Sequence, residues 1–320
     1  PHYSAPLGEN QGRGVASGFW FNVGGETSVA VSLLEDGTVM VTSGSPDIGG
    51  SRASLCSMAA EVLGTDVKNV KAIIADTSSL AYNRHTGGSR VTFAAGIVVI
   101  EATRDIVQQL RERAAMIWDI DVDAVVWEEG EARPAGPNAG EFEPLTLADI
   151  AGKTIETGGP IGARRSKNVQ APGPAFGTHI VDVEVDRETG HVKILRYTAV
   201  QDVGKAVHPS YVEGQIQGGA AQGVGWALNE EYIYDEKGRM ENPGFLDYRI
   251  PVASDLPMIE AVMVEVANPT HPFGVRGVGE VPIIPPMAAI ANAIEDAIGV
   301  RMKDLPMSPP KVLAAIDAAG

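Results

Sequence analysis

A single carboxylate stands at the end of a glycine-rich loop. Residues 271–280 read HPFGVRGVGE, and Glu280 is followed directly by an apolar, helix-like stretch. Glycines at this density let the backbone bend sharply or approach a ligand closely. The carboxylate is either a helix cap, which the helix dipole favours, or a partly desolvated acid–base group. Local chemistry leaves both interpretations open.

The tetrapeptide Gly-Gly-Ser-Arg occurs twice, at residues 49–52 and 87–90, each time just before a predicted helix. Backbone N–H groups and the positive end of the dipole make a helix N-terminus an anion site. A serine hydroxyl and a forked arginine add partners for phosphate oxygens. Two copies favour a ligand with more than one phosphate, such as a pyrophosphate-bridged cofactor. The alternative is two ordinary serine caps with an arginine nearby.

A third candidate is the glycine-rich stretch EGQIQGGAAQGVG at residues 213–225. Glycine and alanine on successive helical turns allow a flat ligand or another backbone to approach closely, at a cost in helix propensity. The amide of Gln222 offers both a donor and an acceptor to the edge of a heterocycle. Tight helix packing with an exposed glutamine is the alternative.

Both helices and hairpins must position these residues. Strand alternation around turn residues predicts hairpins at 27–42 and 179–201 and short strands at 70–75, 231–235 and 259–266. Helical periodicity predicts helices at 52–63, 90–118, 211–228, 285–299 and 309–319, with one short helix at 145–151 inside a Gly- and Pro-rich region. We therefore expect an α+β fold of two mixed subdomains, residues 1–172 and 173–320, built from antiparallel hairpins and packed helices.

Composition excludes several functions. The net charge of −16 over 320 residues argues against nucleic acid or an anionic membrane as a partner. A single cysteine, Cys56, rules out a disulfide framework, a cysteine-ligated iron–sulfur cluster and a zinc ribbon within this chain. The six histidines are scattered, so we expect no metal ligated directly by the protein. We recognise no apolar run of transmembrane length and no leader, and expect a cytoplasmic protein.

Seven segments, taken in order, resemble the molybdenum hydroxylases, the xanthine dehydrogenase and aldehyde oxidoreductase family. They are GGETS at 24–28, SGSPDIGG at 43–50, TGGSR at 86–90, VQDVGKAVHP at 200–209, EGQIQGG at 213–219, AQG at 221–223 and RGVGE at 276–280. The match corresponds to the C-terminal half of that family's molybdopterin-binding subunit, its second molybdenum-binding domain. It is similar to the medium molybdopterin subunit of split nicotinate-type dehydrogenases.

The resemblance implies molybdopterin carrying molybdenum, in the cytosine dinucleotide form that is common in bacteria. It implies that Glu280 is the base in oxidative hydroxylation of an electron-poor carbon of an N-heterocycle or an aldehyde, with water as the oxygen source. The cofactor-binding residues that it implies are Gly49, Gly50, Ser51, Arg52, Thr86, Gly87, Gly88, Ser89, Arg90, Gln222 and Gly279.

One departure motivates an alternative function. Many relatives read DIGQG where this chain reads Asp47-Ile48-Gly49-Gly50-Ser51, so Gly50 replaces the glutamine that usually faces the metal's ligands. A non-catalytic scaffold that holds cofactor for a partner is therefore the main alternative. A stand-alone enzyme without metal is a second one.

The resemblance also implies partner subunits. We expect a larger molybdopterin subunit carrying the N-terminal half, an iron–sulfur subunit and an FAD subunit, with FAD and [2Fe-2S] clusters on the partners only. The expected substrate is a small molecule, and neither nucleic acid nor membrane is an expected partner. Whether the chain is a separate subunit of a split enzyme or a fragment stays open at this point. A separate subunit predicts large apolar surfaces that are hidden in an obligate interface.

Overall fold

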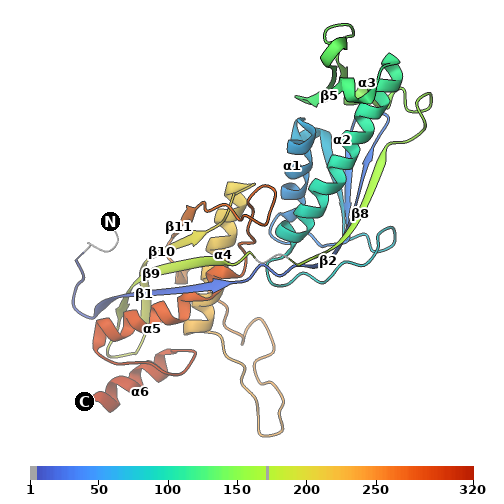
Figure 1. The fold of residues 1–320 in the computed structure, drawn as a ribbon. Helices are drawn as coiled ribbons and strands as arrows, with labels where there is room; N and C mark the ends of the chain where they lie inside the picture. Colours follow the sequence, from blue (N-terminus) through green and yellow to red (C-terminus); the bar gives the residue numbers. More distant parts are fainter. Residues whose placement is uncertain (1–5, 171–172) are drawn as a thin grey trace. The chain divides into compact units, whose positions relative to one another are not determined.

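The computed structural model describes residues 6–170 and 173–320, which form two compact units (Figure 1). Unit 1 comprises Pro1–Phe21, Pro174–Val266 and Val278–Gly320. Unit 2 comprises Asn22–Gly173 and Ala267–Gly277. The predicted subdomains 1–172 and 173–320 differ from these units, because the N-terminal strand belongs to unit 1 and Ala267–Gly277 belongs to unit 2. Residues 171–172, at the predicted boundary, lie outside the described residues.

The sheet of unit 1 has four strands in the order β1-β9-β10-β11. Their bounds are Gln11–Trp20, Ala175–Val185, Val192–Asp202 and Ile259–Val264. β9 runs antiparallel to both β1 and β10, whereas β10 and β11 are parallel. The predicted strand at 231–235 is absent, and that segment makes only the isolated bridge between Tyr234 and Met240. No other strand lies beside it to extend the ladder among the described residues.

Three helices complete unit 1: α4 (Pro209–Leu228), α5 (Pro285–Ile298) and α6 (Pro309–Ala319). Glycine makes the close packing of α5 on β1 possible. A Cβ added at Gly14 would overlap the carbonyl oxygen of Ala289. The alternating valines of β9 are buried together with apolar residues of α4 and α5, which form one core.

The segment Val281–Ile298 is long and apolar enough to cross a membrane by length and composition alone. The sequence expectation that no such run exists is therefore wrong. The buried residues of α5 belong to the core of unit 1, including Ile290 and Ile294 at 0 % exposure. Packing inside the unit thus explains the apolar composition of this segment.

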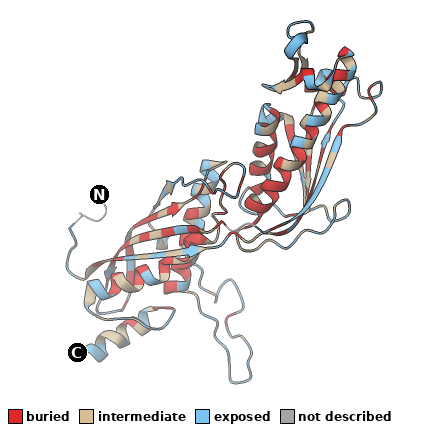
Figure 2. Cartoon of the chain, viewed as in Figure 1, coloured by how far each residue is buried: buried red, intermediate tan, exposed pale blue. Residues whose placement is uncertain are grey.

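Unit 2 holds a second four-stranded sheet in the order β4-β3-β2-β8 and a small sheet in the order β5-β6-β7. The larger sheet is built from β2 (Gly25–Leu33), β3 (Val39–Ser43), β4 (Val70–Ile74) and β8 (Gly162–Val169). The small sheet is built from β5 (Val125–Glu128), β6 (Glu131–Pro134) and β7 (Leu145–Thr146). The helices α1, α2 and α3 span Ser51–Leu63, Gly96–Trp118 and Leu147–Ala151. Buried residues gather along α1 and α2, as Figure 2 shows. The predicted mixed α and β class is confirmed.

Candidate functional site

Glu280 occupies the N-cap position of a short 3-10 turn, Val281–Ile283, directly before α5. Its side chain makes no capping hydrogen bond to that turn. The residue is half-buried. The helix-cap interpretation therefore does not describe what this carboxylate does in the structure, and the acid–base interpretation stays a prediction.

The backbone around Glu280 packs tightly on α4. A Cβ added at Gly219 would overlap Pro282 Cγ and would lie 3.2 Å from the carbonyl oxygen of Gly279. A Cβ at Gly223 would lie 2.5 Å from Pro286 Cγ. Only glycine at 219 and 223 allows this approach, because any side chain there would push the turn away from the helix. The glycine-rich pattern of α4 thus fixes the Glu280 segment against the helix.

The opposite side of α4 is open. Gln222 is exposed there, and a Cβ added at Gly214 or Gly218 would meet nothing within 4 Å. Residues 214, 218 and 222 follow the i, i+4 spacing of one helical face. The tight-packing interpretation applies to the face of Gly219 and Gly223, whereas ligand binding by the open face stays a prediction. One face packs tightly, and the other exposes backbone beside the amide of Gln222.

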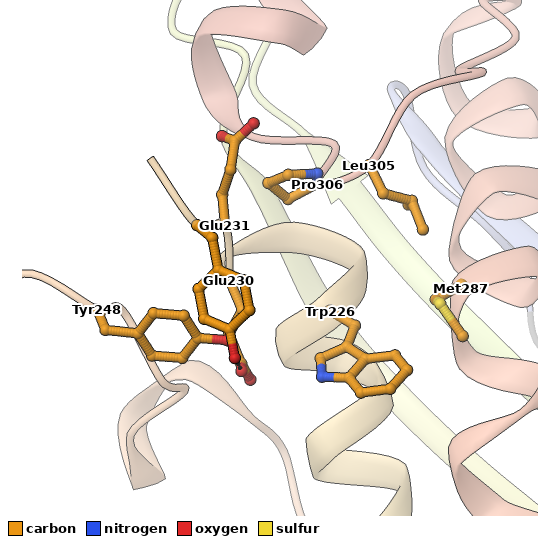
Figure 3. A pocket seen from close by; sticks show the side chains of 8 residues that line it. Trp226, Glu230, Glu231, Tyr248, Met287, Leu305 and Pro306 are labelled. Atoms are coloured by element: carbon orange, nitrogen blue, oxygen red, sulfur yellow. Dashed lines mark hydrogen bonds between the residues drawn. The ribbon is translucent and has the colours of Figure 1, made fainter. Parts of the chain in front are cut away.

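A pocket of about 330 Å³ lies in unit 1 at the C-terminal end of α4. Figure 3 shows Trp226 projecting from α4 on one side and Tyr248 directing its hydroxyl toward Glu230. Tyr248 Oη donates to Glu230 Oε2 over 2.8 Å, and this hydrogen bond raises the pKa of Tyr248 to about 12. Sequence reasoning missed this pocket, because its walls come from a helix end, a long loop and residues 305–306. The only available signal was the run of aromatic residues between 226 and 248.

In unit 2 the loop of residues 86–90 is built on strained backbone. Gly88 has φ 74° and Ser89 has φ 55°, a conformation that glycine favours and serine rarely adopts. The carbonyl oxygen of Gly88 accepts a hydrogen bond of 3.1 Å from the backbone N–H of Val23. A Cβ at Gly277 would overlap the carbonyl oxygen of Ser89. The RGVGE motif therefore contributes its Gly277 to the TGGSR loop of unit 2, although Glu280 lies in unit 1.

The side chain of Asn22 holds Gly277 in place. Asn22 is 2 % exposed, its Oδ1 accepts from the backbone N–H of Gly277 over 2.7 Å, and its Nδ2 donates to the Gly277 carbonyl over 3.2 Å. The Asn22 side chain thus pairs with both the N–H and the C=O of Gly277, as the backbone of a neighbouring strand would. No sequence signal marked Asn22, because a lone asparagine after a strand is common in turns.

Arg90 is completely buried, and its guanidinium binds the protein itself. It donates to the carbonyl oxygens of Gly24, Arg84 and Glu26 at 2.8, 3.0 and 3.0 Å. Burial lowers the pKa of Arg90 from its usual value. In this structure the side chain holds the start of β2 to the 86–90 loop. The guanidinium thus positions the 86–90 loop, and a contact of Arg90 with the cofactor stays a prediction.

The other Gly-Gly-Ser-Arg copy forms the N-terminus of α1. Gly49 and Gly50 adopt φ 67° and 81°. Asp47 Oδ1 accepts from the backbone N–H of Arg52 over 2.9 Å and from the Ser51 hydroxyl over 3.3 Å. A carboxylate of the same chain thus caps this helix, at the position that the sequence pattern suggested for a phosphate. Cofactor contacts of residues 49–52 stay a prediction.

Two buried hydroxyls of unit 2 lack a hydrogen-bond partner, one in the predicted cofactor loop at residues 86–90 and one in the SGSPDIGG motif. They are Thr86 Oγ1 and Ser45 Oγ. A buried polar group left unpaired costs about 1–3 kcal/mol. A polar group bound at residues 86–90 would give the Thr86 hydroxyl a partner, so this loop fits the cofactor that the motifs imply. Among the described residues, no group of three or more His, Cys, Asp or Glu side chains could hold a metal ion.

Comparison with known proteins identifies the family. A family model described as a molybdopterin cofactor-binding domain matches residues 5–257. The chain belongs to this molybdopterin-binding family. The xanthine dehydrogenase molybdenum-binding subunit of Escherichia coli O157:H7 is 34 % identical over 309 residues, covering 93 % of this chain and 40 % of the relative. The nicotine 6-hydroxylase large subunit of Paenarthrobacter nicotinovorans is 33 % identical over 300 residues, covering 90 % and 36 %. The chain thus spans about two fifths of the length of these molybdopterin-binding relatives.

Solved structures show the same molybdopterin-binding fold. Quinoline 2-oxidoreductase from Pseudomonas putida 86 has a TM-score of 0.85 and 25 % identity, covering 96 % of this chain and 42 % of its own. CO dehydrogenase from Oligotropha carboxidovorans has a TM-score of 0.84 at 22 % identity, covering 97 % and 41 %. The resemblance recognised from the seven segments is therefore confirmed at the level of family and fold.

Proposed function

We propose that this chain is the molybdopterin-binding part of a multi-subunit molybdenum hydroxylase, an oxidoreductase, and that Glu280 is its catalytic base. One observation carries the proposal. In a member of the molybdopterin-binding family, a glutamate is held on a turn locked against α4, yet its side chain does not cap that turn. The packing of the turn on α4 thus fixes the position of Glu280, and its side chain does not serve as the cap of the turn.

The proposed cofactor is molybdopterin with molybdenum, in the cytosine dinucleotide form. When bound, it accepts two electrons from the substrate, while water is the source of the oxygen. In unit 2, the hydroxyl of Thr86 and the backbone of residues 86–90 would hold it, because these groups form a shaped loop with an unpaired donor. In unit 1, Gln222 would present its amide, and Glu280 would take a proton during attack on the substrate.

The proposed substrate is a small molecule with an electron-poor carbon, an N-heterocycle or an aldehyde. Support comes from the names of relatives and structural neighbours, which include nicotine 6-hydroxylase and quinoline 2-oxidoreductase. An aldehyde oxidoreductase subunit from Escherichia coli strain K12 is 31 % identical over 306 residues. The choice between the two classes depends on pocket walls from the part of the relatives' length that this chain does not span. The expected location remains the cytoplasm.

The proposed partners are a larger molybdopterin subunit, an iron–sulfur subunit and an FAD subunit. One relative is the gamma subunit of the 6-hydroxypseudooxynicotine dehydrogenase complex, which supports assembly from several chains. Exposed apolar residues of unit 1 also support it: Phe245 and Leu246 are 100 % and 99 % exposed. Phe19 and Phe176 lie opposite each other in β1 and β9 and are 52 % and 55 % exposed. Such exposed apolar area is typical of interaction surfaces.

The scaffold alternative is favoured by one specific observation. Gly50 has φ 81°, a backbone conformation that a glutamine side chain rarely adopts. A glutamine at this position would therefore be strained in the backbone that this chain adopts. A scaffold would bind cofactor and leave turnover independent of Glu280.

Assembly of the complex with its partner subunits, followed by molybdenum and cytidine nucleotide analysis, tests the proposal. We expect about one molybdenum per chain in both the wild type and Glu280→Gln, and substrate oxidation only in the wild type. Glu280→Asp is the matched control, because it keeps the carboxylate and moves it by one methylene. A loaded complex that oxidises no substrate in the wild type would support the scaffold instead. An active complex without molybdenum would refute both.

A further inference from the structure

Two buried polar atoms lie unsatisfied in the interior of unit 1. They are Nε2 of His179 and Oε1 of Gln201, on side chains that are 0 % and 1 % exposed. Ala16 pairs with His179, and the same face of β1 packs on α5 through Gly14. Cross-strand partners project on one face of a sheet, so His179 faces the helix-covered core. An unpaired buried acceptor requires a physical explanation.

The two side chains lie on the same face of the sheet, next to a glycine. Gln201 pairs with Gly177, whereas His179 pairs with Ala199, so Gln201 and His179 are diagonal neighbours across β9 and β10. A Cβ added at Gly177 would lie 3.9 Å from His179 Nε2 and 3.3 Å from Val281 Cγ1. On this face Gly177 therefore lies next to His179 and next to Val281, the residue that follows Glu280 in the chain.

The hydrogen bonds already made determine what can bind beside Gly177. Gln201 Nε2 donates to the carbonyl oxygen of Val278 over 3.1 Å, which leaves Oε1 as the acceptor still to be paired. His179 Nδ1 is paired with Tyr197 Oη at 2.8 Å, which leaves Nε2. Burial lowers the pKa of His179 to about 4, so the ring is neutral at neutral pH. A water molecule can donate to Gln201 Oε1 and pair with Nε2 in either ring tautomer.

We propose that one buried water bridges Gln201 Oε1 and His179 Nε2 beside Gly177, and that Gln201 is a positioning residue for Glu280. The resulting chain of hydrogen bonds runs from Tyr197 through His179, the water and Gln201 to the carbonyl of Val278, two residues before Glu280. This chain of hydrogen bonds holds Val278, which precedes the Val281–Ile283 turn, to strand β10. Helix α4 holds the turn itself through the packing of Gly219 on Pro282. The catalytic consequence rests on the proposed function, whereas the structural anchor does not.

Hydrogen exchange in the full chain tests the anchor without any cofactor. Gln201→Met keeps the side-chain volume and removes both the donor and the acceptor. Gln217→Met is the matched control, because Gln217 Nε2 makes an equivalent 3.1 Å bond to the carbonyl of Ile259, away from the turn. We expect amides of residues 278–283 to exchange about tenfold faster in Gln201→Met and at the wild-type rate in Gln217→Met. Equal exchange of this segment in the wild type and Gln201→Met would overturn the anchor.

Gly177→Ala tests the water separately. The added methyl group would lie 3.9 Å from His179 Nε2, where it would exclude the bridging water, and it removes no hydrogen-bonding group of Gln201. We expect a high-resolution crystal structure of the wild type to show one water between Gln201 Oε1 and His179 Nε2, and the variant to lack it. A wild-type structure without this water would overturn the water bridge.

Turnover of the assembled, molybdenum-loaded complex tests the positioning role. We expect Gln201→Met to lower kcat about tenfold, with KM and molybdenum content unchanged. If Glu280→Gln abolishes turnover but Gln201→Met leaves kcat unchanged, Gln201 does not position Glu280. If Glu280→Gln itself keeps full turnover, the proposed function fails, and the exchange experiment still decides the anchor.

Discussion

Lowering the pH from 7 to 5 should destabilise unit 1 through one buried histidine. His179 is 0 % exposed, and burial lowers its pKa from the usual 6.5 to about 4. Between these two values the unfolded chain binds a proton that the folded chain does not bind. The free energy of unfolding therefore falls as the pH drops below about 6.5 and reaches its full loss near pH 4.

The two pKa values give the size of the effect. At pH 7 the unfolded histidine is mostly neutral, so the linkage costs only a few tenths of a kcal/mol. At pH 5 the unfolded form is mostly protonated and the folded form is mostly neutral, which corresponds to a loss of about 2 kcal/mol. A loss of roughly 1–3 kcal/mol agrees with the structure.

Urea denaturation at pH 7 and pH 5 checks this value. His179→Asn is the variant of choice, because its amide can keep a hydrogen bond to Tyr197 Oη in place of Nδ1 and does not titrate. Any constant destabilisation by the substitution cancels when each protein is compared with itself at the two pH values. We expect the wild type to lose about 2 kcal/mol more than the variant between pH 7 and pH 5. An identical pH dependence in both proteins would refute the reasoning.

Two further predictions concern residues that position the candidate site. Gly219→Ala should destabilise the chain by about 1–3 kcal/mol in urea denaturation, because its methyl group would overlap Pro282. Gly218→Ala, one residue earlier with nothing within 4 Å of its Cβ, should stabilise it by about 0.5–1 kcal/mol, and equal effects at the two positions would contradict this packing. Arg90→Met should cost roughly 3 kcal/mol or more, since it leaves the carbonyls of Gly24 and Glu26 unpaired in a buried place, and a neutral result would show that these hydrogen bonds do not hold the loop.

Local patterns predicted most elements of the fold. The hairpin of β9 and β10 follows from strand alternation around a Glu-Thr-Gly turn, and the helices α1, α4, α5 and α6 follow from 3.6-residue periodicity with glycine or proline at their ends. The pairing of β1 with β9 was not predictable in this way. Residues 11–20 carry three glycines, and their partner strand lies more than 150 residues later in the chain. The glycines of β1 allow α5 to approach closely. The sequence around them does not indicate this contact, because α5 lies far away in the chain.

The sequence motifs predicted the family and the candidate site segments. They did not predict the contacts that form only when distant segments pack together. The order of TGGSR, EGQIQGG and RGVGE identified the family. Sequence alone did not indicate that the Arg90 guanidinium is buried and donates to backbone carbonyls, because those carbonyls lie on another segment of the chain. It also missed Gln201, because a glutamine in a strand has no signature until the register places it beside Gly177.

The most direct test of the central claim is the rate at which substrate reduces the molybdenum centre in the assembled complex. Anaerobic rapid mixing of wild type and Glu280→Gln with a single oxidisable N-heterocycle or aldehyde isolates the step in which the base acts. We expect Glu280→Gln to bind cofactor and substrate normally and to be reduced about 10²–10⁴-fold more slowly. Reduction of the variant at the wild-type rate would contradict the assignment of Glu280 as the base.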